Sequence, residues 1–355
     1  MINISTLKGH TGSVYCLTIW NNHLYSGSDD RTIRVWNEKH ECVATFRGHT
    51  NTVTCLTTWN NHLYSGSCDN TIRVWNEKHE CMDVLKGHTG TISCLTVWNN
   101  HLYSGSWDNT IRVWNEKHEC VASLKGHTDT VYCLTTWNNQ LYSGSWDRTI
   151  RVWNEKQECV DILKGHTNSV YCLTTWNNQL YSGSSDRTIR VWNEKQECVA
   201  TLRGHTKVVY CLTAWNNYLY SGSWDNTIRV WNESHECVAT LRGRTGTISC
   251  LTTWNNHLYS GSYDGIIRVW NESQECAASL KGHTSSVTCL TTWNNRLYSG
   301  SNDNTIRVWG EFYLADFCKL DKTKKAEIWT TILVFNRLQI CKSIWLPIFR
   351  AILKN

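Results

Sequence analysis

Residues 9–47 read GHTGSVYCLTIWNNHLYSGSDDRTIRVWNEKHECVATFR, and this 39-residue unit repeats along the chain without insertion or deletion. Eight copies fit between residues 9 and 309, the last ending at its closing tryptophan. Such self-similarity is typical of architectures in which each repeat is one supersecondary unit packed on its neighbours. The units begin at Gly9, Gly48, Gly87, Gly126, Gly165, Gly204, Gly243 and Gly282, each followed by histidine except at Gly243-Arg244.

One unit contains four short segments with the composition of β-strands. The segments Val14–Trp20 and 24–28 are rich in aromatic and β-branched residues, and an Asn-Asn pair that tolerates positive φ separates them, as in a tight hairpin. Further strand-like segments follow at 32–37 and at Cys42–Phe46. Residues 1–309 contain no proline and no long helical apolar period. We therefore predict an all-β fold, a β-propeller of eight four-stranded blades.

Four residues at fixed offsets in each unit resemble the WD-repeat family over residues 1–309. In that family a histidine, a serine, an aspartate and a tryptophan form a hydrogen-bonded tetrad that ties the strands of a blade together. The closing pair reads Trp-Asn here, as at Trp36-Asn37, in place of the family's Trp-Asp, a departure outside the tetrad. The resemblance assigns tetrads to His10, Ser26, Asp30 and Trp36; His49, Ser65, Asp69 and Trp75; His127, Ser143, Asp147 and Trp153; and His283, Ser299, Asp303 and Trp309, with the same offsets in the other units.

The two ends of the repeat region predict how the ring closes. Residues 2–10 align with the fourth strand and Gly-His turn of other units, and no such strand follows Trp309. We expect the N-terminal strand to complete the eighth blade, because a closed ring leaves no unpaired edge there to promote aggregation.

The composition changes after Trp309, so residues 310–355 are interpreted as a separate tail. This segment holds eight Lys or Arg against four Asp or Glu, and its apolar residues have a helical spacing. Polar residues interrupt the apolar run, which argues against a membrane span. Three interpretations stay open: a helix packed on the propeller or on a partner, a basic helix on a membrane surface, or an unstructured end.

Eighteen cysteines raise the question of disulfides and metal sites. Fifteen of them are repeat positions in the first and fourth strands, and no close pair has metal-ligand spacing. We therefore expect free cysteines that act as small buried apolar residues, with no metal and no cofactor. No secretory segment is apparent at the N-terminus, and free thiols point to a reducing compartment, the cytoplasm or the nucleus.

The recurring His, Ser and Asp also raise the possibility of acyl-transfer catalysis. Nearly identical sets occur in almost every unit, whereas catalysis needs one asymmetric site with an oxyanion-stabilising pocket. Buried polar groups that satisfy one another are what a repeated blade requires. We interpret the tetrads as structural and predict no enzymatic activity.

Positions that vary between units are the best guide to partner specificity. In the resembled family, the residues three and five after the histidine and the residue before the aspartate face partners. Aromatic residues concentrate at these positions from unit three to unit seven, and Trp and Tyr are common anchors of interfaces. No arginine occupies these positions, although Arg31, Arg148 and Arg187 follow the aspartate. The predicted partner-binding residues are Tyr15, Asp29, Trp107, Tyr132, Trp146, Tyr171, Tyr210, Trp224 and Tyr263.

Three classes of function agree with these patterns. The leading one is a non-enzymatic, monomeric scaffold that binds a protein or peptide on its aromatic face. The second is an adaptor in a larger assembly, such as a substrate receptor of a ubiquitin ligase. The third is a multivalent binder of a small ligand or glycan. Without its tail the chain is close to neutral, so we expect no nucleic-acid partner.

Overall fold

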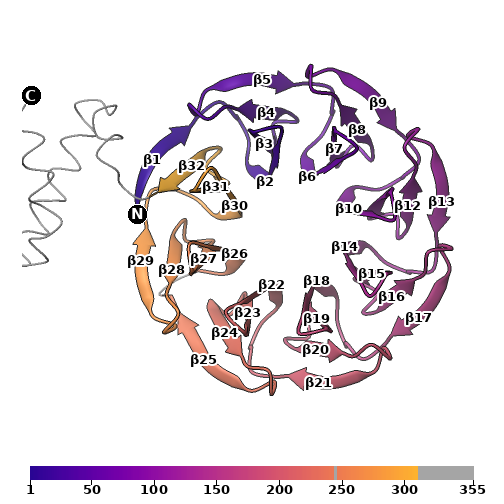
Figure 1. The fold of residues 1–355 in the computed structure, drawn as a ribbon, viewed down its shortest axis with the longest axis vertical. Coiled ribbons are helices and arrows are strands. Elements are labelled where there is room, and N and C mark those ends of the chain that lie inside the picture. The colour runs from indigo at the N-terminus through magenta and orange to yellow at the C-terminus, as the bar shows by residue number, and fades with distance from the viewer. Residues whose placement is uncertain (244–245, 311–355) are drawn as a thin grey trace, which may run out of the picture.

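The computed structural model describes residues 1–243 and 246–310, and these form eight four-stranded antiparallel sheets around a central opening (Figure 1). This confirms the predicted eight-bladed propeller. The innermost strands are β2 (Val14–Trp20), β6 (Val53–Trp59), β10 (Ile92–Trp98), β14 (Val131–Trp137), β18 (Val170–Trp176), β22 (Val209–Trp215), β26 (Ile248–Trp254) and β30 (Val287–Trp293). The second strands are β3 (His23–Ser28), β7 (His62–Ser67), β11 (His101–Ser106), β15 (Gln140–Ser145), β19 (Gln179–Ser184), β23 (Tyr218–Ser223), β27 (His257–Ser262) and β31 (Arg296–Ser301).

Two outer layers of strands complete each blade. The third strands are β4 (Ile33–Trp36), β8 (Ile72–Trp75), β12 (Ile111–Trp114), β16 (Ile150–Trp153), β20 (Ile189–Trp192), β24 (Thr227–Trp231), β28 (Ile267–Trp270) and β32 (Ile306–Gly310). The outermost strands are β5 (Cys42–Phe46), β9 (Cys81–Leu85), β13 (Cys120–Leu124), β17 (Cys159–Leu163), β21 (Cys198–Leu202), β25 (Cys237–Arg242) and β29 (Cys276–Leu280).

The N-terminal strand β1 (Ile2–Leu7) is the outermost strand of the eighth blade, as the sequence predicts. It pairs antiparallel with β32, from Ile2 opposite Gly310 to Leu7 opposite Ile306. Leu7 is only 3% exposed in the core of that blade. The tail begins at the end of β32, and residues 311–355, on which its predicted helix falls, lie outside the described residues.

The hairpin between the first two strands of each blade has the conformation that its Asn-Asn pair predicts. Asn21 and Asn22 have φ angles of 44° and 56°, and the equivalent pairs repeat these values. Positive φ at both central residues gives a turn whose twist matches that of the flanking strands.

The apolar core lies between neighbouring blades. Trp20 and Tyr25 of the first blade pack in one cluster with Val53 and Trp75 of the second, and every interface repeats this pattern. The blades approach so closely that a Cβ at Gly27 would lie 2.7 Å from Val53 Cγ1. The Ser-Gly-Ser segment of each second strand therefore permits the close packing that closes the ring.

Candidate functional site

The predicted tetrad residues meet within each of the seven blades whose unit has the histidine, and there they form one chain of hydrogen bonds. In the first blade His10 Nδ1 lies 2.7 Å from Asp30 Oδ2, His10 Nε2 lies 2.8 Å from Ser26 Oγ, and Trp36 Nε1 donates to Ser26 Oγ at 2.9 Å. An ionised carboxylate only accepts hydrogen bonds, so Nδ1 carries the proton that it donates to Asp30. Nε2 of a neutral ring then accepts from Ser26. The His-to-Asp distance is 2.6–2.8 Å in the seven blades whose unit has the histidine.

The aspartate joins the tetrad to the turns beside it. Asp30 also accepts from the backbone N–H of Thr11 and from the hydroxyl of Thr32, at 3.0 and 2.6 Å. Burial opposes ionisation of Asp30, but the hydrogen bonds from His10 and Thr32 outweigh it and hold the pKa of the carboxyl well below its usual range. The tetrad therefore contains a fixed negative charge that stabilises the folded blade at neutral pH.

The same atoms have the order of an acyl-transfer triad, but their burial prevents that chemistry. Ser26 is 0% exposed, and its oxygen already accepts from the indole of Trp36. A nucleophile needs an open path to a carbonyl carbon and donors for the oxyanion. The tetrads have the geometry of structural networks that tie strands together.

The seventh unit departs from the pattern. Arg244 stands where other units have histidine, and residues 244–245 lie outside the described residues. Asp264 accepts from Arg268 Nη2 at 2.8 Å, and Arg268 is buried, only 7% exposed. Ser260 keeps its hydrogen bond from Trp270 Nε1 at 2.9 Å. An arginine from the third strand thus supplies a positive donor to the aspartate of this blade.

The residue five positions after each Gly-His histidine lies at one mouth of the central channel. In the second blade this residue is Thr54, whose hydroxyl donates to the backbone oxygen of Ile92 in the next blade at 2.5 Å. Ser93, Ser249 and Thr288 donate in the same way to their neighbouring blades. The other four blades have tyrosines at this position, at Tyr15, Tyr132, Tyr171 and Tyr210.

Six aromatic side chains at this mouth contact one another, and we call them the aromatic cluster. The rings of Tyr132 and Trp146 stack with centroids 6.0 Å apart, and Tyr132 meets Tyr171 edge to face at 5.0 Å. Similar contacts connect Trp107 to Trp146 and Tyr210 to Trp224. The members are Trp107, Tyr132, Trp146, Tyr171, Tyr210 and Trp224.

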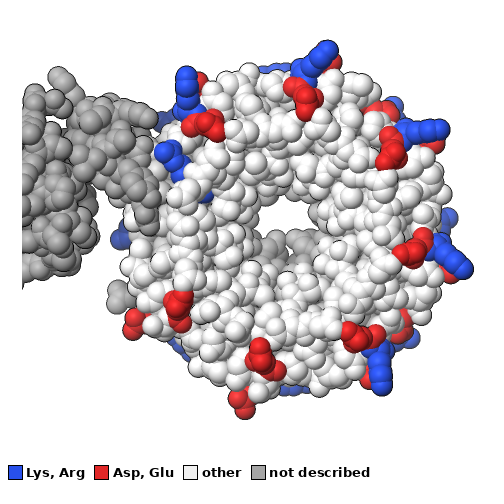
Figure 2. Space-filling model, viewed as in Figure 1, with Lys and Arg blue, Asp and Glu red and all other residues white. Residues whose placement is uncertain are grey.

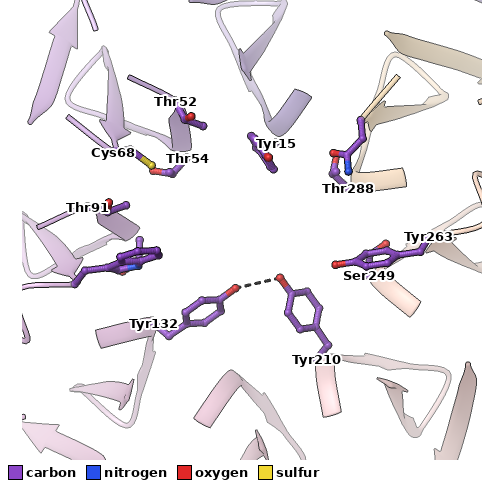
Figure 3. Close-up of a pocket in the computed structure, with 13 residues that line it drawn as sticks. Tyr15, Thr52, Thr54, Cys68, Thr91, Tyr132, Tyr210, Ser249, Tyr263 and Thr288 are labelled. Atoms are coloured by element: carbon purple, nitrogen blue, oxygen red, sulfur yellow. Dashed lines mark hydrogen bonds between the residues drawn. The ribbon is translucent and has the colours of Figure 1, made fainter. Parts of the chain in front are cut away.

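A hydrogen bond between two tyrosines spans the cluster. The hydroxyls of Tyr132 and Tyr210 lie 3.1 Å apart, although the residues belong to blades separated by another blade (Figure 3). Burial raises the pKa of both phenols, so both are neutral and one donates to the other. The paired hydroxyls are therefore polar groups held in place within the otherwise apolar aromatic cluster.

The mouth contains a cavity of about 530 Å³. Figure 3 shows Tyr132 and Tyr210 on one side of this cavity, opposite Tyr15 and the hydroxyl-bearing residues of neighbouring blades. Among the residues that the structure describes, no charged side chain lines it. The lining consists of Tyr15, Thr52, Thr54, Cys68, Thr91, Ser93, Trp107, Tyr132, Tyr210, Ser249, Tyr263, Thr288 and Asn302.

Many charged side chains lie on the outer rim of the ring. Figure 2 shows the face opposite the one viewed in Figure 3, and on it Lys, Arg, Asp and Glu follow the outer rim while the surface around the opening is uncharged. Within residues 1–243 and 246–310, no three His, Cys, Asp or Glu side chains gather as metal ligands. The same part of the chain has no helix of the length and apolarity that crossing a membrane requires.

Comparison with known proteins agrees with the tetrads and the blades. The family model described as "WD domain, G-beta repeat" matches the chain at residues 2–37, 40–76, 79–115, 118–154, 157–193, 196–232, 235–271 and 274–310. The chain belongs to the WD-repeat family. WD-repeat propellers are generally non-catalytic scaffolds that bind proteins or peptides.

Among solved structures, this WD-repeat chain is similar to the crystal structure of the computationally designed Ika8 protein, crystal packing No.1 in P63. The TM-score is 0.81 at 30% sequence identity, and the match covers 88% of this chain and 100% of that chain. A search of curated proteins found no match.

The predicted partner-binding residues fall into two groups at the mouth of the WD-repeat propeller. Trp107, Tyr263 and Tyr15 are 52, 50 and 42% exposed. Trp146 and Trp224 are partly buried, and their indole N–H groups are enclosed without a hydrogen-bond acceptor. These two tryptophans therefore do not stand free as anchors, because each packs against a tyrosine of its own blade and against Tyr171 of the fifth blade.

Two further sequence expectations change in the structure. Asp29 is exposed but also accepts from the hydroxyl of Thr52, so it connects the first two blades. The expected burial of the cysteines is wrong for the fourth-strand positions, which are exposed because the outermost strands begin on the rim. Thr52, Thr91 and Asn302 also line the cavity. They occupy positions that the family resemblance assigns to partner contacts, but they were not among the predicted binding residues, which are mostly aromatic.

Proposed function

We propose that this WD-repeat protein is a non-enzymatic scaffold that holds an uncharged or weakly charged segment of a protein partner at the aromatic mouth of its channel. The observation that carries the proposal is the asymmetry of the cavity: Tyr132 and Tyr210 of the aromatic cluster lie on one side, opposite Tyr15 and a set of hydroxyl-bearing residues. Large aromatic anchors surrounded by smaller contacts that exclude water are typical of binding hot spots.

The contacts at the mouth support a preformed site. The rings of the aromatic cluster support one another, so little side-chain freedom remains to be lost when a partner binds. Trp107, at one end of the aromatic cluster, and Tyr263 are about half exposed, so both side chains are available to contact a bound segment. The residues at the mouth differ from one side of the ring to the other, so the mouth suits one asymmetric segment better than several copies of a small ligand.

Selection of peptides from a displayed random library on the full chain tests the proposal. We expect the selected peptides to bind Trp107→Ala and Tyr263→Ala about tenfold or more weakly, as for hot-spot residues. Met82→Ala, which removes an exposed apolar side chain from strand β9, is the matched control and should bind normally. All three variants should have the melting temperature of the parent, because each replaced side chain is about half exposed or more.

Two outcomes would contradict this assignment. Peptides that bind the Trp107 and Tyr263 variants as well as the parent would place the binding face elsewhere on the propeller. Binding to a glycan array by the same sample, abolished in the Trp107 variant while no peptide is selected, would favour the glycan-binding class.

A further inference from the structure

Each blade with a cysteine in its fourth strand carries two kinds of thiol. The inner thiols lie in the first strands, at Cys16, Cys55, Cys94, Cys133, Cys172, Cys211, Cys250 and Cys289. The outer thiols begin the outermost strands, at Cys42, Cys81, Cys120, Cys159, Cys198, Cys237 and Cys276. All are free, and only the outer set is exposed.

The inner thiols are unsuited to reaction. The sulfur of Cys16 faces the next blade, 3.9 Å from the backbone oxygen of Val53. Burial raises the pKa of the Cys133 thiol to about 12, and the same cause raises that of Cys211 to about 12. The nucleophilic thiolate is therefore scarce at these positions.

Six outer thiols each have an arginine guanidinium against the sulfur. Arg34 Nη1 lies 3.5 Å from Cys42 Sγ, and the corresponding distance is 3.2 Å between Arg190 and Cys198. Equivalent contacts of 3.3–3.5 Å occur at Cys81, Cys120, Cys159 and Cys237.

The glycine of the Gly-His pair lies against the guanidinium of each of these arginines, and Arg112 and Arg151 also donate to its backbone oxygen. A Cβ at Gly126 would lie 2.6 Å from Arg151 Nη1, and Arg151 Nη2 donates to the backbone oxygen of Gly126 at 2.8 Å. The glycine of the Gly-His pair thus leaves room for a guanidinium that reaches the outer sulfur. The carboxylate next to one such thiol, Glu158, accepts from Asn154 Nδ2 at 2.9 Å in its own turn.

We propose that these six arginine-paired outer cysteines are sites of reversible S-thiolation by small anionic disulfides of the glutathione class. The cysteine thiolate attacks one sulfur of the disulfide, the S–S bond of the reagent breaks, and a mixed disulfide forms. The released thiolate takes up the proton that the cysteine lost. The cysteine is oxidised and the departing half of the reagent is reduced, so no other oxidant is needed.

The guanidinium favours this reaction in two ways. It attracts the carboxylates of the reagent, and it stabilises the negative charge that is shared among the three sulfurs as the bond is exchanged. Each outer thiol lies on a separate blade, at intervals around the circumference (Figure 1). A mixed disulfide with a small molecule is therefore the expected product, and it projects from the rim without entering the core.

The seventh blade supplies an internal control. Arg268 is directed to Asp264, with Nη2 2.8 Å from Oδ2. The sulfur of Cys276 donates to the backbone oxygen of Ala278, as the six paired thiols also donate to the residue two positions further on. Cys276 has the exposure of the other outer thiols, but among the described residues no guanidinium contacts its sulfur. A comparison of Cys276 with the six others isolates the effect of the arginine within one molecule.

The test treats the reduced full-length chain with glutathione disulfide, blocks unreacted thiols at timed intervals and digests the protein with trypsin. The outer cysteines fall in peptides of different sequence, such as HECVATFR, QECVDILK and VWNESQECAASLK, so mass spectrometry follows each site separately. We expect the six paired cysteines to react about threefold or more faster than Cys276. A rate ratio of this size corresponds to the free energy of an exposed charge–charge contact. The inner thiols should stay unmodified until the protein is unfolded.

The variant Arg151→Gln should slow Cys159 to the rate of Cys276 while the other paired sites keep theirs. Arg148→Gln, at an exposed arginine of the same blade, is the matched control and should change no rate. Protection of the inner thiols in both variants shows that they are folded. Equal rates at Cys276 and the paired sites, or an unchanged rate at Cys159 in the folded Arg151 variant, would overturn the proposal.

Discussion

Replacing Asp147 with alanine tests the contribution of the tetrad in the fourth blade. Asp147 accepts from His127 Nδ1 at 2.6 Å, from the backbone N–H groups of Thr128 and Thr149 at 3.1 and 2.9 Å, and from the Thr149 hydroxyl at 2.6 Å. Only the histidine donor is deeply buried, since His127 is 7% exposed. The threonine donors lie in turns that water can reach.

The magnitude follows from that difference in burial. A buried donor left without a partner costs about 1–3 kcal/mol, and rehydrated donors add little. We therefore expect Asp147→Ala to lower the free energy of unfolding by about 1–3 kcal/mol. Asp129→Ala is the matched control, because Asp129 is an exposed aspartate of the same blade that caps only the N–H of Thr130.

Urea unfolding at neutral pH, followed by tryptophan fluorescence, measures the difference between the two variants. Hydrogen exchange should locate the weakening in strands β14 to β17. A midpoint for Asp147→Ala equal to that of Asp129→Ala would refute the tetrad as a source of stability. Weakening confined to a different blade would refute the assignment of the network to single blades.

Two other predictions concern closure and pH. Deleting residues 1–7 should lower the melting temperature of the whole ring, because burial of Leu7 alone contributes about 1.5–3 kcal/mol, and a truncated chain that melts like the parent would show that β1 does not close it. The tetrad aspartates have folded-state pKa values below their ordinary 3.8, as at Asp30 and Asp303. Their contribution is complete above that pH and is lost as the pH falls below it, so the urea midpoint should drop there. The difference in urea midpoint between the parent and Asp147→Ala should become smaller as the pH falls through this range. A difference that stays constant with pH would contradict the link between the aspartate pKa values and stability.

The sequence of one repeat determines the secondary structure of a blade, because the residues that specify its strands and turns lie within the same unit. Alternating apolar residues, an Asn-Asn pair and a closing tryptophan fall within a single unit, so the strands and the hairpins could be predicted from that unit. The resemblance to the WD-repeat family then implied which residues form the tetrad. The N-terminal strand was also predictable, because residues 2–10 repeat a fourth strand that the last unit lacks.

Contacts between units were decided only by the tertiary structure. Tyr132 and Tyr210 are 78 residues apart, and their hydroxyls meet because ring closure brings the inner strands of alternate blades to one mouth. The same curvature partly buries Trp146 while Trp107 stays exposed. No pattern within one unit carries this information, since the direction of a side chain at the channel depends on which side chains its neighbouring blades place there.

For the two kinds of cysteine, too, the sequence predicts the strand, and only the tertiary structure shows the surroundings of the thiol. Their spacing places them in the first and fourth strands, but the sequence does not show that one strand faces the next blade and the other the rim. Nor does it show that the third-strand arginine reaches the outer sulfur in six blades and turns to Asp264 in the seventh. That choice depends on the Gly-His turn against which the guanidinium packs, a contact between residues 25 positions apart that forms only when the blade is assembled.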